Sequence, residues 1–214
     1  MTITAHAGAY GTPDNSIENV RKVTEENCEI FEIDVTFRPG GTPVIVHDGN
    51  PSETDGVPLD EVFAIVAKHP SIRINLDLKS VNNLPAIDAL LEKYGIADRV
   101  FYTGVGESWT GTVAANSKVP YYLNVAIDEN QMHDETAVNA VADKIISSGA
   151  TGLNISHSSC SEEVVKVMHS RNLPVSVWTI NDKETALKFI KMGVDNITSR
   201  VPDTIKAALA EYAG

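Results

Sequence analysis

Short runs of aliphatic and β-branched residues alternate with amphipathic stretches along nearly the whole chain, and this alternation restricts the possible folds more than any other feature. The runs predict eight strands, at residues 3–6, 30–37, 72–78, 100–103, 121–126, 152–156, 175–180 and 194–198. Each is followed by a predicted helix, at residues 15–26, 59–68, 84–94, 108–116, 135–147, 162–170, 183–191 and 203–212. Eight strand–helix units predict an α/β fold, the (β/α)8 TIM barrel, in which functional side chains collect at the carboxyl ends of the strands.

Residues at the element boundaries support this division. Ser161 and Asp182 precede helical stretches and are predicted N-caps, while Gly95, Gly149 and Gly193 lie just past predicted helix ends. A doubly wound open sheet is the alternative fold. No glycine-rich phosphate loop follows the first predicted strand, and the candidate site residues come from several strands, so the sequence favours the barrel.

One segment departs from the alternation. Residues 38–42, Arg-Pro-Gly-Gly-Thr, join the strand at 30–37 to a further strand at 44–47 through a turn too short for a crossover helix. The segment therefore predicts a short β-hairpin extension after the second strand. Such a hairpin would return His47 to the barrel mouth where Glu32 and Asp34 lie. The polar residues 48–56, which include proline and glycine, predict a loop over the same mouth.

Length and charge narrow the possible partners. At 214 residues the chain is expected to form a single domain over residues 1–214. No apolar run approaches the roughly 18 residues of a membrane span, and no secretory signal opens the chain, so we expect a cytoplasmic protein without membrane insertion. The net charge of −12 disfavours nucleic acid and indicates a small-molecule substrate. Cys28 and Cys160 lack zinc-ligand spacing and are expected to be packing residues.

Acidic residues two apart mark two of the predicted strands. Glu32 and Asp34 in Phe-Glu-Ile-Asp-Val share one strand face, and Asp77 and Lys79 in Leu-Asp-Leu-Lys repeat the arrangement. Three converging carboxylates suit a hard divalent cation, and a lysine with nearby histidines adds an anion contact and proton-transfer groups. The pattern indicates a metal-assisted phosphoester enzyme. The simpler interpretations are a solvated polar strand face for the acids and an ion pair for Lys79.

Motifs in a fixed order make the chain similar to the glycerophosphodiester phosphodiesterases of the phospholipase-C-like barrel superfamily. The family's opening His-Arg-Gly is matched in part by His6-Ala7-Gly8, and its Pro-Glu-Asn-Thr-like stretch by residues 13–16. Its Glu-x-Asp-Val, hairpin and His-Asp resemble residues 32–35 and 47–48, and its Glu-x-Lys resembles residues 77–79. Residues 177–181 and 193–198 look like its closing motifs.

The resemblance implies a metal-dependent phosphodiesterase that cleaves a glycerophosphodiester to sn-glycerol 3-phosphate and an alcohol. It implies a divalent metal ion, Mg or Ca, held by Glu32, Asp34 and Asp77; an acid–base pair formed by His6 and His47; and substrate contacts from Lys79 and Trp178. Trp178 alone could equally fill the barrel interior.

Two departures from the family pattern leave other activities open. Ala7 stands where the family has an arginine, so a charge-assisted phosphate contact is missing from that position. The segment between His47 and Asn75 is shorter than its family counterpart, which predicts a reduced lid. The alternatives are a lysophospholipase D-like or sphingomyelinase D-like enzyme, suggested by the aspartate at position 77, and a weakened relative that only binds metal or phosphate.

Overall fold

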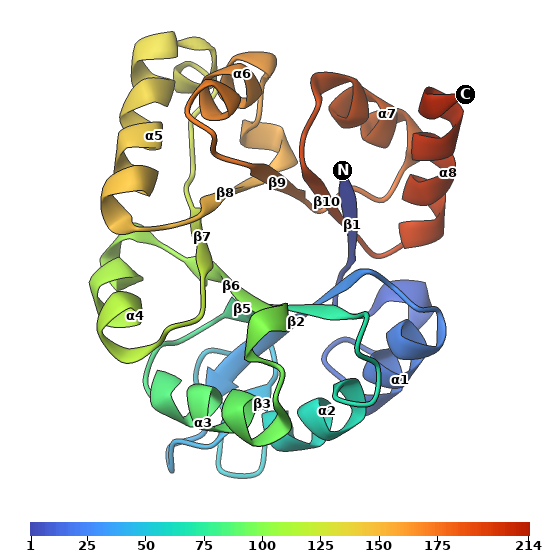
Figure 1. Cartoon of the computed structure of the whole chain (residues 1–214), viewed down its shortest axis with the longest axis vertical. Helices are drawn as coiled ribbons and strands as arrows, with labels where there is room; N and C mark the ends of the chain where they lie inside the picture. The colour runs from blue at the N-terminus through green and yellow to red at the C-terminus, as the bar shows by residue number, and fades with distance from the viewer.

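The computed structural model describes residues 1–214 as a closed ring of parallel strands with helices packed around it (Figure 1). β1 pairs with both β2 and β10, and this double pairing closes the ring. The eight ring strands are β1 (Thr2–Ala5), β2 (Ile30–Phe37), β5 (Arg73–Leu78), β6 (Val100–Val105), β7 (Tyr121–Asn124), β8 (Gly152–Ser156), β9 (Val175–Trp178) and β10 (Asn196–Ser199). The structure confirms the predicted TIM barrel.

Helices connect consecutive ring strands and cover the outside of the barrel (Figure 1). The α-helices are α1 (Ile17–Glu25), α2 (Leu59–Val66), α3 (Leu84–Tyr94), α4 (Thr110–Asn116), α5 (Glu135–Ser148), α6 (Glu162–Ser170), α7 (Lys183–Met192) and α8 (Pro202–Ala213). Single 3-10 turns occur at η1 (Ala9–Gly11), η2 (Ala97–Arg99), η3 (Glu107–Trp109), η4 (Gln131–His133) and η5 (His157–Ser159).

The predicted helix boundaries are confirmed where a cap could be identified from the sequence. The side chains of Ser161 and Asp182 each accept a hydrogen bond from a backbone N–H in the first turn of α6 and α7. Helices α3, α5 and α7 end at Gly95, Gly149 and Gly193, all in the left-handed backbone region. These positions are favourable for glycine because its backbone enters that region without a Cβ clash.

The predicted hairpin is present on the carboxyl end of β2, outside the ring. β3 (Pro43–Ile45) runs antiparallel to β2, and a two-residue strand that was not predicted, β4 (Val57–Pro58), pairs with β3. The predicted strand at 44–47 was wrong at its end, because β3 stops at Ile45 and His47 follows it. The predicted strands 121–126 and 175–180 were likewise too long, since β7 and β9 stop at Asn124 and Trp178.

A continuous apolar core lies between the ring and the helices. On β2, Phe31 and Ile33 are fully buried, and α2 buries Val62 and Phe63 on the face that was predicted to be apolar. Complete burial of one such side chain contributes about 1.5–3 kcal/mol, so this layer stabilises the barrel. Both cysteines are free and buried, as expected of packing residues. None of the helices has the length and apolar character needed to span a membrane.

One glycine of the ring occupies a position that no other residue fits. Gly104 in β6 has a φ of +74°, and a Cβ built on it would collide with the Leu78 carbonyl oxygen and lie 2.8 Å from the Leu78 nitrogen. Gly111 in α4 provides a control, because a Cβ there would meet no atom within 4 Å. We expect Gly104→Ala to lower the free energy of unfolding by about 2–5 kcal/mol.

At the control position, substitution of glycine by alanine should change the free energy of unfolding in the opposite direction. Gly111→Ala is expected to raise the free energy of unfolding by about 0.5–1 kcal/mol, because alanine loses less backbone entropy in a helix. Urea titration followed by circular dichroism measures both. Equal effects of the two substitutions would contradict the close backbone approach of β5 and β6.

Candidate active site

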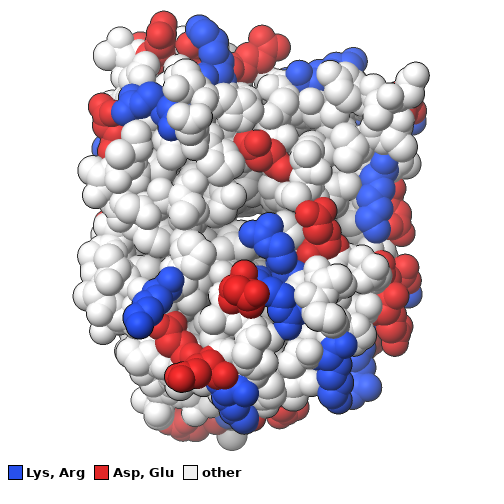
Figure 2. Space-filling model, viewed as in Figure 1, with Lys and Arg blue, Asp and Glu red and all other residues white.

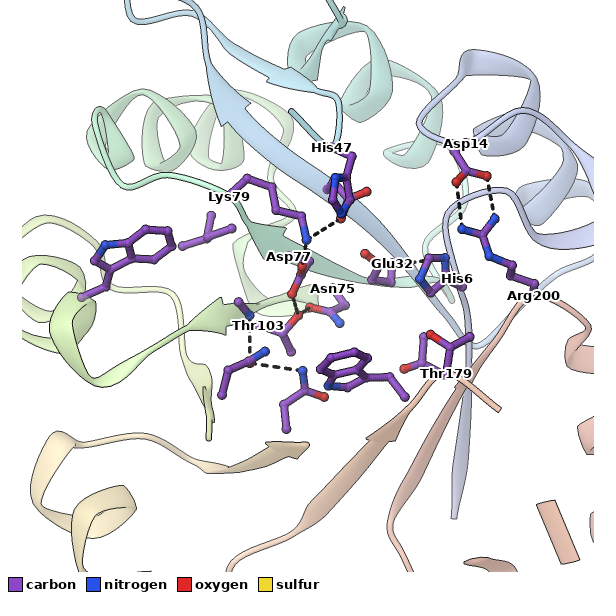
Figure 3. Close-up of a pocket in the computed structure, with 18 residues that line it drawn as sticks. His6, Asp14, Glu32, His47, Asn75, Asp77, Lys79, Thr103, Thr179 and Arg200 are labelled. Carbon is purple, nitrogen blue, oxygen red and sulfur yellow. Dashed lines mark hydrogen bonds and ion pairs between the residues drawn. The ribbon is translucent and has the colours of Figure 1, made fainter. Parts of the chain in front are cut away.

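A cavity of about 510 Å³ opens at the carboxyl ends of the ring strands (Figure 3). Figure 2 shows the other end of the barrel, where the strands begin and where acidic and basic side chains are interspersed around a central hollow. Only 3 of the 18 lining residues are hydrophobic, so the cavity suits a polar or charged ligand. All seven site residues predicted from the sequence lie along its wall: His6, Glu32, Asp34, His47, Asp77, Lys79 and Trp178.

Three carboxylates from two adjacent strands form the base of this cavity. Asp34 of β2 is paired in register with Asp77 of β5, and Glu32 shares the inner face of β2 two residues before Asp34. Glu32 and Asp34 are only 5% and 4% exposed. One oxygen from each of the three groups lies within 4.8 Å of the others, which fits the donor set of a divalent cation.

The electrostatics of Glu32 reflect this crowding. Burial raises its pKa well above the ordinary value, and the neighbouring charges of Asp34 and Asp77 raise it further. The backbone N–H of Ala7 donates a 3.0 Å hydrogen bond to Glu32 Oε2, and this bond lowers the pKa of Glu32. A cation among these oxygens would relieve the repulsion, so the acidic cluster could bind a metal ion.

Lys79 provides positive charge at the edge of the acidic cluster. Its Nζ lies 3.0 Å from Asp34 Oδ1 and 2.5 Å from Asp77 Oδ2. Burial alone would lower the pKa of Lys79, but the two aspartates outweigh it and the pKa lies above its ordinary value. Lys79 is therefore a permanent cation that faces the cavity.

The two histidines reach the cavity from different elements (Figure 3). His6 follows β1, and its Nδ1 lies 2.7 Å from the Ala7 carbonyl oxygen. Because a carbonyl only accepts, Nδ1–H is the donor, which leaves Nε2 of neutral His6 free to take a proton. His47 follows β3 and makes no hydrogen bond with its side chain. The hairpin thus brings His47 to the same cavity as His6, as the sequence predicted.

Trp178 lies at the mouth and not in the barrel interior. Its side chain is 39% exposed at the end of β9, where it lines the cavity. The neighbouring His157 of η5 donates from Nδ1 to the Trp178 carbonyl at 3.2 Å. An exposed indole beside a polar cavity offers a flat surface for the apolar atoms of a ligand.

Two residues that hold the aspartates were not identified from the sequence. Asn15 donates from Nδ2 to Asp34 Oδ2 at 2.7 Å and accepts the Asp34 backbone N–H at 3.0 Å. Thr103 donates from Oγ1 to Asp77 Oδ1 at 2.6 Å. Asn15 falls within the motif at residues 13–16, which was a signal for its importance. Nothing in the local sequence distinguishes Thr103.

The wall opposite the hairpin consists of neutral amides. Asn154 donates from Nδ2 to Asn124 Oδ1 at 3.1 Å, and the same oxygen accepts the Gly104 backbone N–H at 2.9 Å. These bonds fix the orientation of Asn124, whose own Nδ2 makes no protein hydrogen bond. The amides therefore offer donors and acceptors to the hydroxyl groups of a ligand.

An ion pair lies on the other side of His6 (Figure 3). Arg200, directly after β10, donates to both carboxylate oxygens of Asp14, at 2.6 and 2.8 Å. The hydrogen bond from Arg200 is the main reason that the pKa of Asp14 lies below its ordinary value. Both residues line the cavity, so four carboxylates face two permanent cations there.

Comparisons with known proteins agree with this architecture. A model of the glycerophosphoryl diester phosphodiesterase family matches residues 63–204, well over half of the chain. A glycerophosphodiester phosphodiesterase of Bacillus altitudinis is 24% identical over 238 residues, which cover 94% of this chain and 95% of that protein.

Solved structures share the fold over nearly its full extent. A phosphodiesterase of Oleispira antarctica, solved in complex with its product sn-glycerol-3-phosphate, has a TM-score of 0.81 and 20% identity, covering 98% of this chain and 97% of that one. A glycerophosphodiester phosphodiesterase of Parabacteroides distasonis has a TM-score of 0.74 and 19% identity, covering 100% and 98%.

The raised pKa of Glu32 has a consequence for stability. The folded protein keeps this proton to a higher pH than the unfolded chain, where a glutamate titrates near 4.5. The contribution of Glu32 to the free energy of unfolding is therefore fully present below that pH and is lost as the pH rises through the folded-state pKa. Glu32→Gln should remove this loss.

Urea unfolding in EDTA from acidic to neutral pH tests the expectation. The free energy of unfolding of the wild-type protein should fall with rising pH relative to that of Glu32→Gln. The exposed Glu61→Gln serves as the control and should follow the wild type. Parallel profiles for Glu32→Gln and the wild type would contradict the raised pKa.

Proposed function

Because this chain belongs to the glycerophosphoryl diester phosphodiesterase family and is therefore a phosphoric diester hydrolase, we propose that it cleaves a small glycerophosphodiester to sn-glycerol 3-phosphate and an alcohol. The observation that carries the proposal is the convergence of three carboxylates, two histidines and a lysine in one polar cavity at the barrel mouth. The product-bound Oleispira antarctica structure supports the choice of product.

Glu32, Asp34 and Asp77 are the proposed metal ligands. Their carboxylate oxygens suit either Mg²⁺ or Ca²⁺, and a divalent ion held there would neutralise charge that develops on the phosphoryl oxygens. Asn15 and Thr103 keep the two aspartates in place, and Lys79 adds a cation beside them. In this proposal Lys79 contacts the phosphate, and Trp178 packs against the carbon atoms of the substrate.

His6 and His47 are the proposed acid–base pair. An oxygen nucleophile, either a hydroxyl of the substrate or water, forms a bond to phosphorus as the bond to the departing alcohol breaks. His6 takes the proton of the nucleophile at Nε2, since its Nδ1–H is held by the Ala7 carbonyl. His47 gives a proton to the departing oxygen. When the nucleophile is a substrate hydroxyl, water opens the resulting cyclic phosphate with the histidine roles reversed.

The polar lining favours a soluble diester over a lysolipid. A lysophospholipase D-like or sphingomyelinase D-like enzyme must accommodate a long acyl chain, whereas 15 of the 18 lining residues here are not hydrophobic. The Asn124 and Asn154 amides instead provide hydrogen bonds for the hydroxyl groups of glycerol or of a polar head group.

Product release from a panel of glycerophosphodiesters and lysolipids, with Mg²⁺, Ca²⁺ or EDTA, tests the proposal directly. We expect release of sn-glycerol 3-phosphate from a soluble diester, its loss in EDTA, and its recovery with one of the two metals. Asp34→Asn should lose both the activity and the metal-induced rise in melting temperature, because it removes a charged ligand. Metal-sensitive turnover of lysolipids alone would favour the lipid enzyme, and no turnover at all would favour a binding protein.

Substitution of the histidines tests their roles. His6→Ala and His47→Ala should each lower kcat by about 10²–10⁴-fold, the range contributed by one positioned acid or base. The exposed His133→Ala serves as the control and should retain wild-type rates. Both site variants should keep the metal-induced rise in melting temperature, since neither residue is a proposed ligand. Wild-type rates in His6→Ala and His47→Ala would exclude the acid–base assignment.

A further inference from the structure

The cavity has few cations for an enzyme that must receive an anionic diester. Lys79 and Arg200 are the only lysine and arginine in its lining, opposite four carboxylates. Lys79 already lies between Asp34 and Asp77, at 3.0 and 2.5 Å, so these two carboxylates balance its charge. Position 7, directly after His6, is a buried alanine that carries no charge and does not line the cavity. Arg200 is the second cation, beside Lys79, that can meet a phosphate.

The backbone of the barrel places Arg200 at the level of His6. β10 pairs in parallel with β1, with Ser199 beside Ala5, so Arg200 leaves β10 where His6 leaves β1. The His6 backbone N–H donates to the Ser199 carbonyl at 2.8 Å, and the Arg200 backbone N–H donates to Asn181 Oδ1 at 2.9 Å. The peptide group between Ser199 and Arg200 is therefore held on both sides, one strand away from a proposed catalytic residue.

The guanidinium lies over the backbone that follows His6. A Cβ built on Gly8, whose φ is +77°, would lie 2.7 Å from Arg200 Nη1 and would overlap the Asp14 carboxylate. Glycine at position 8 thus leaves the space that the Asp14–Arg200 pair occupies. Figure 3 shows this pair beside His6 at the edge of the cavity.

Arg200 lines the cavity with some of its N–H groups unpaired. The contact with Asp14 uses one N–H on each terminal nitrogen of the guanidinium, and its other N–H groups have no protein partner. A guanidinium fork matches the oxygens of a phosphate group. The side chains of Arg200 and Asp14 are 40% and 53% exposed, and an ion pair with this degree of exposure contributes little to stability.

We propose that Arg200 is the phosphate-binding arginine of this enzyme, supplied by the last barrel strand in place of a residue at position 7, and that Asp14 orients it. The assignment rests on the proposed function, since a phosphodiester is the ligand that needs this cation. Arg200 binds the non-bridging phosphoryl oxygens on the His6 side of the cavity, while Lys79 lies on the side of the acidic cluster.

Arginine substitutions with a matched control test this role. Arg171 is the control, because it forms a partly exposed ion pair with Asp143 and does not line the cavity. With the preferred diester and metal, Arg200→Ala should lower kcat/KM by about 10²–10³-fold, as expected for loss of one charged contact in the transition state. Arg200→Lys should recover part of that loss, and Arg171→Ala should match the wild type.

Two further measurements distinguish phosphate binding from a structural role. Calorimetric titration of the metal-loaded protein with inorganic phosphate should show about 10–100-fold weaker binding in Arg200→Ala at an unchanged melting temperature. Ethylguanidinium at millimolar concentration should restore part of the turnover of Arg200→Ala. Chemical rescue is preferable to Ala7→Arg because Ala7 is 1% exposed, so that substitution would place a charged side chain on a buried position.

The outcomes separate this inference from the proposed function. An active wild-type enzyme whose Arg200→Ala variant keeps both its kcat/KM and its phosphate affinity would overturn the role of Arg200 alone. A wild-type protein that cleaves no diester would overturn the proposed function. In that case the phosphate titration still decides whether Arg200 binds the anion, since weaker binding in Arg200→Ala supports the inference and equal binding overturns it.

Discussion

The parallel register of β2 against β5 determines where the charges of the cavity lie. Asp34 is paired with Asp77, and side-chain alternation then puts Glu32 on the same inner face. Phe31 and Ile33 occupy the opposite face, where they are fully buried in the core between ring and helices. A slip of one residue would exchange the two faces, exposing the apolar side chains to the cavity and burying the acids in the core. Apolar packing on the outside of the barrel therefore holds the acidic cluster inside it.

Each acid of the cluster is also held by a specific donor, because an unpaired carboxylate would be costly at this depth in the cavity. Glu32 accepts a hydrogen bond from the Ala7 backbone N–H. Asn15 donates to the Asp34 carboxylate, and Thr103 donates to the Asp77 carboxylate. Lys79 lies between the two aspartates. These contacts preserve the geometry of the cluster without fully neutralising it, at some cost in stability.

The sequence alone predicts the parts of this structure that follow from local periodicity. Glu32, Asp34 and Asp77 could be assigned to one site because alternation fixes the face of a strand and parallel strands end at one edge. The ends of β7 and β9 were misplaced, since propensity does not show where a ladder stops. The partnership of Asp14 with Arg200 was not predicted, because 186 residues separate them and only closure of the ring brings them together.

Closure of the ring by β1 also determines when the different parts of the cavity can form during synthesis of the chain. β1 precedes the other ring strands in the chain, yet one of its two neighbours in the ring is β10, which follows all of them. A nascent chain can pair β2 with β5 early and assemble the acidic cluster while it is still attached to the ribosome. His6 gains its Ser199 neighbour, and the cavity gains Arg200, only after β10 has emerged. The lining of the candidate site is therefore completed only when β10 pairs with β1.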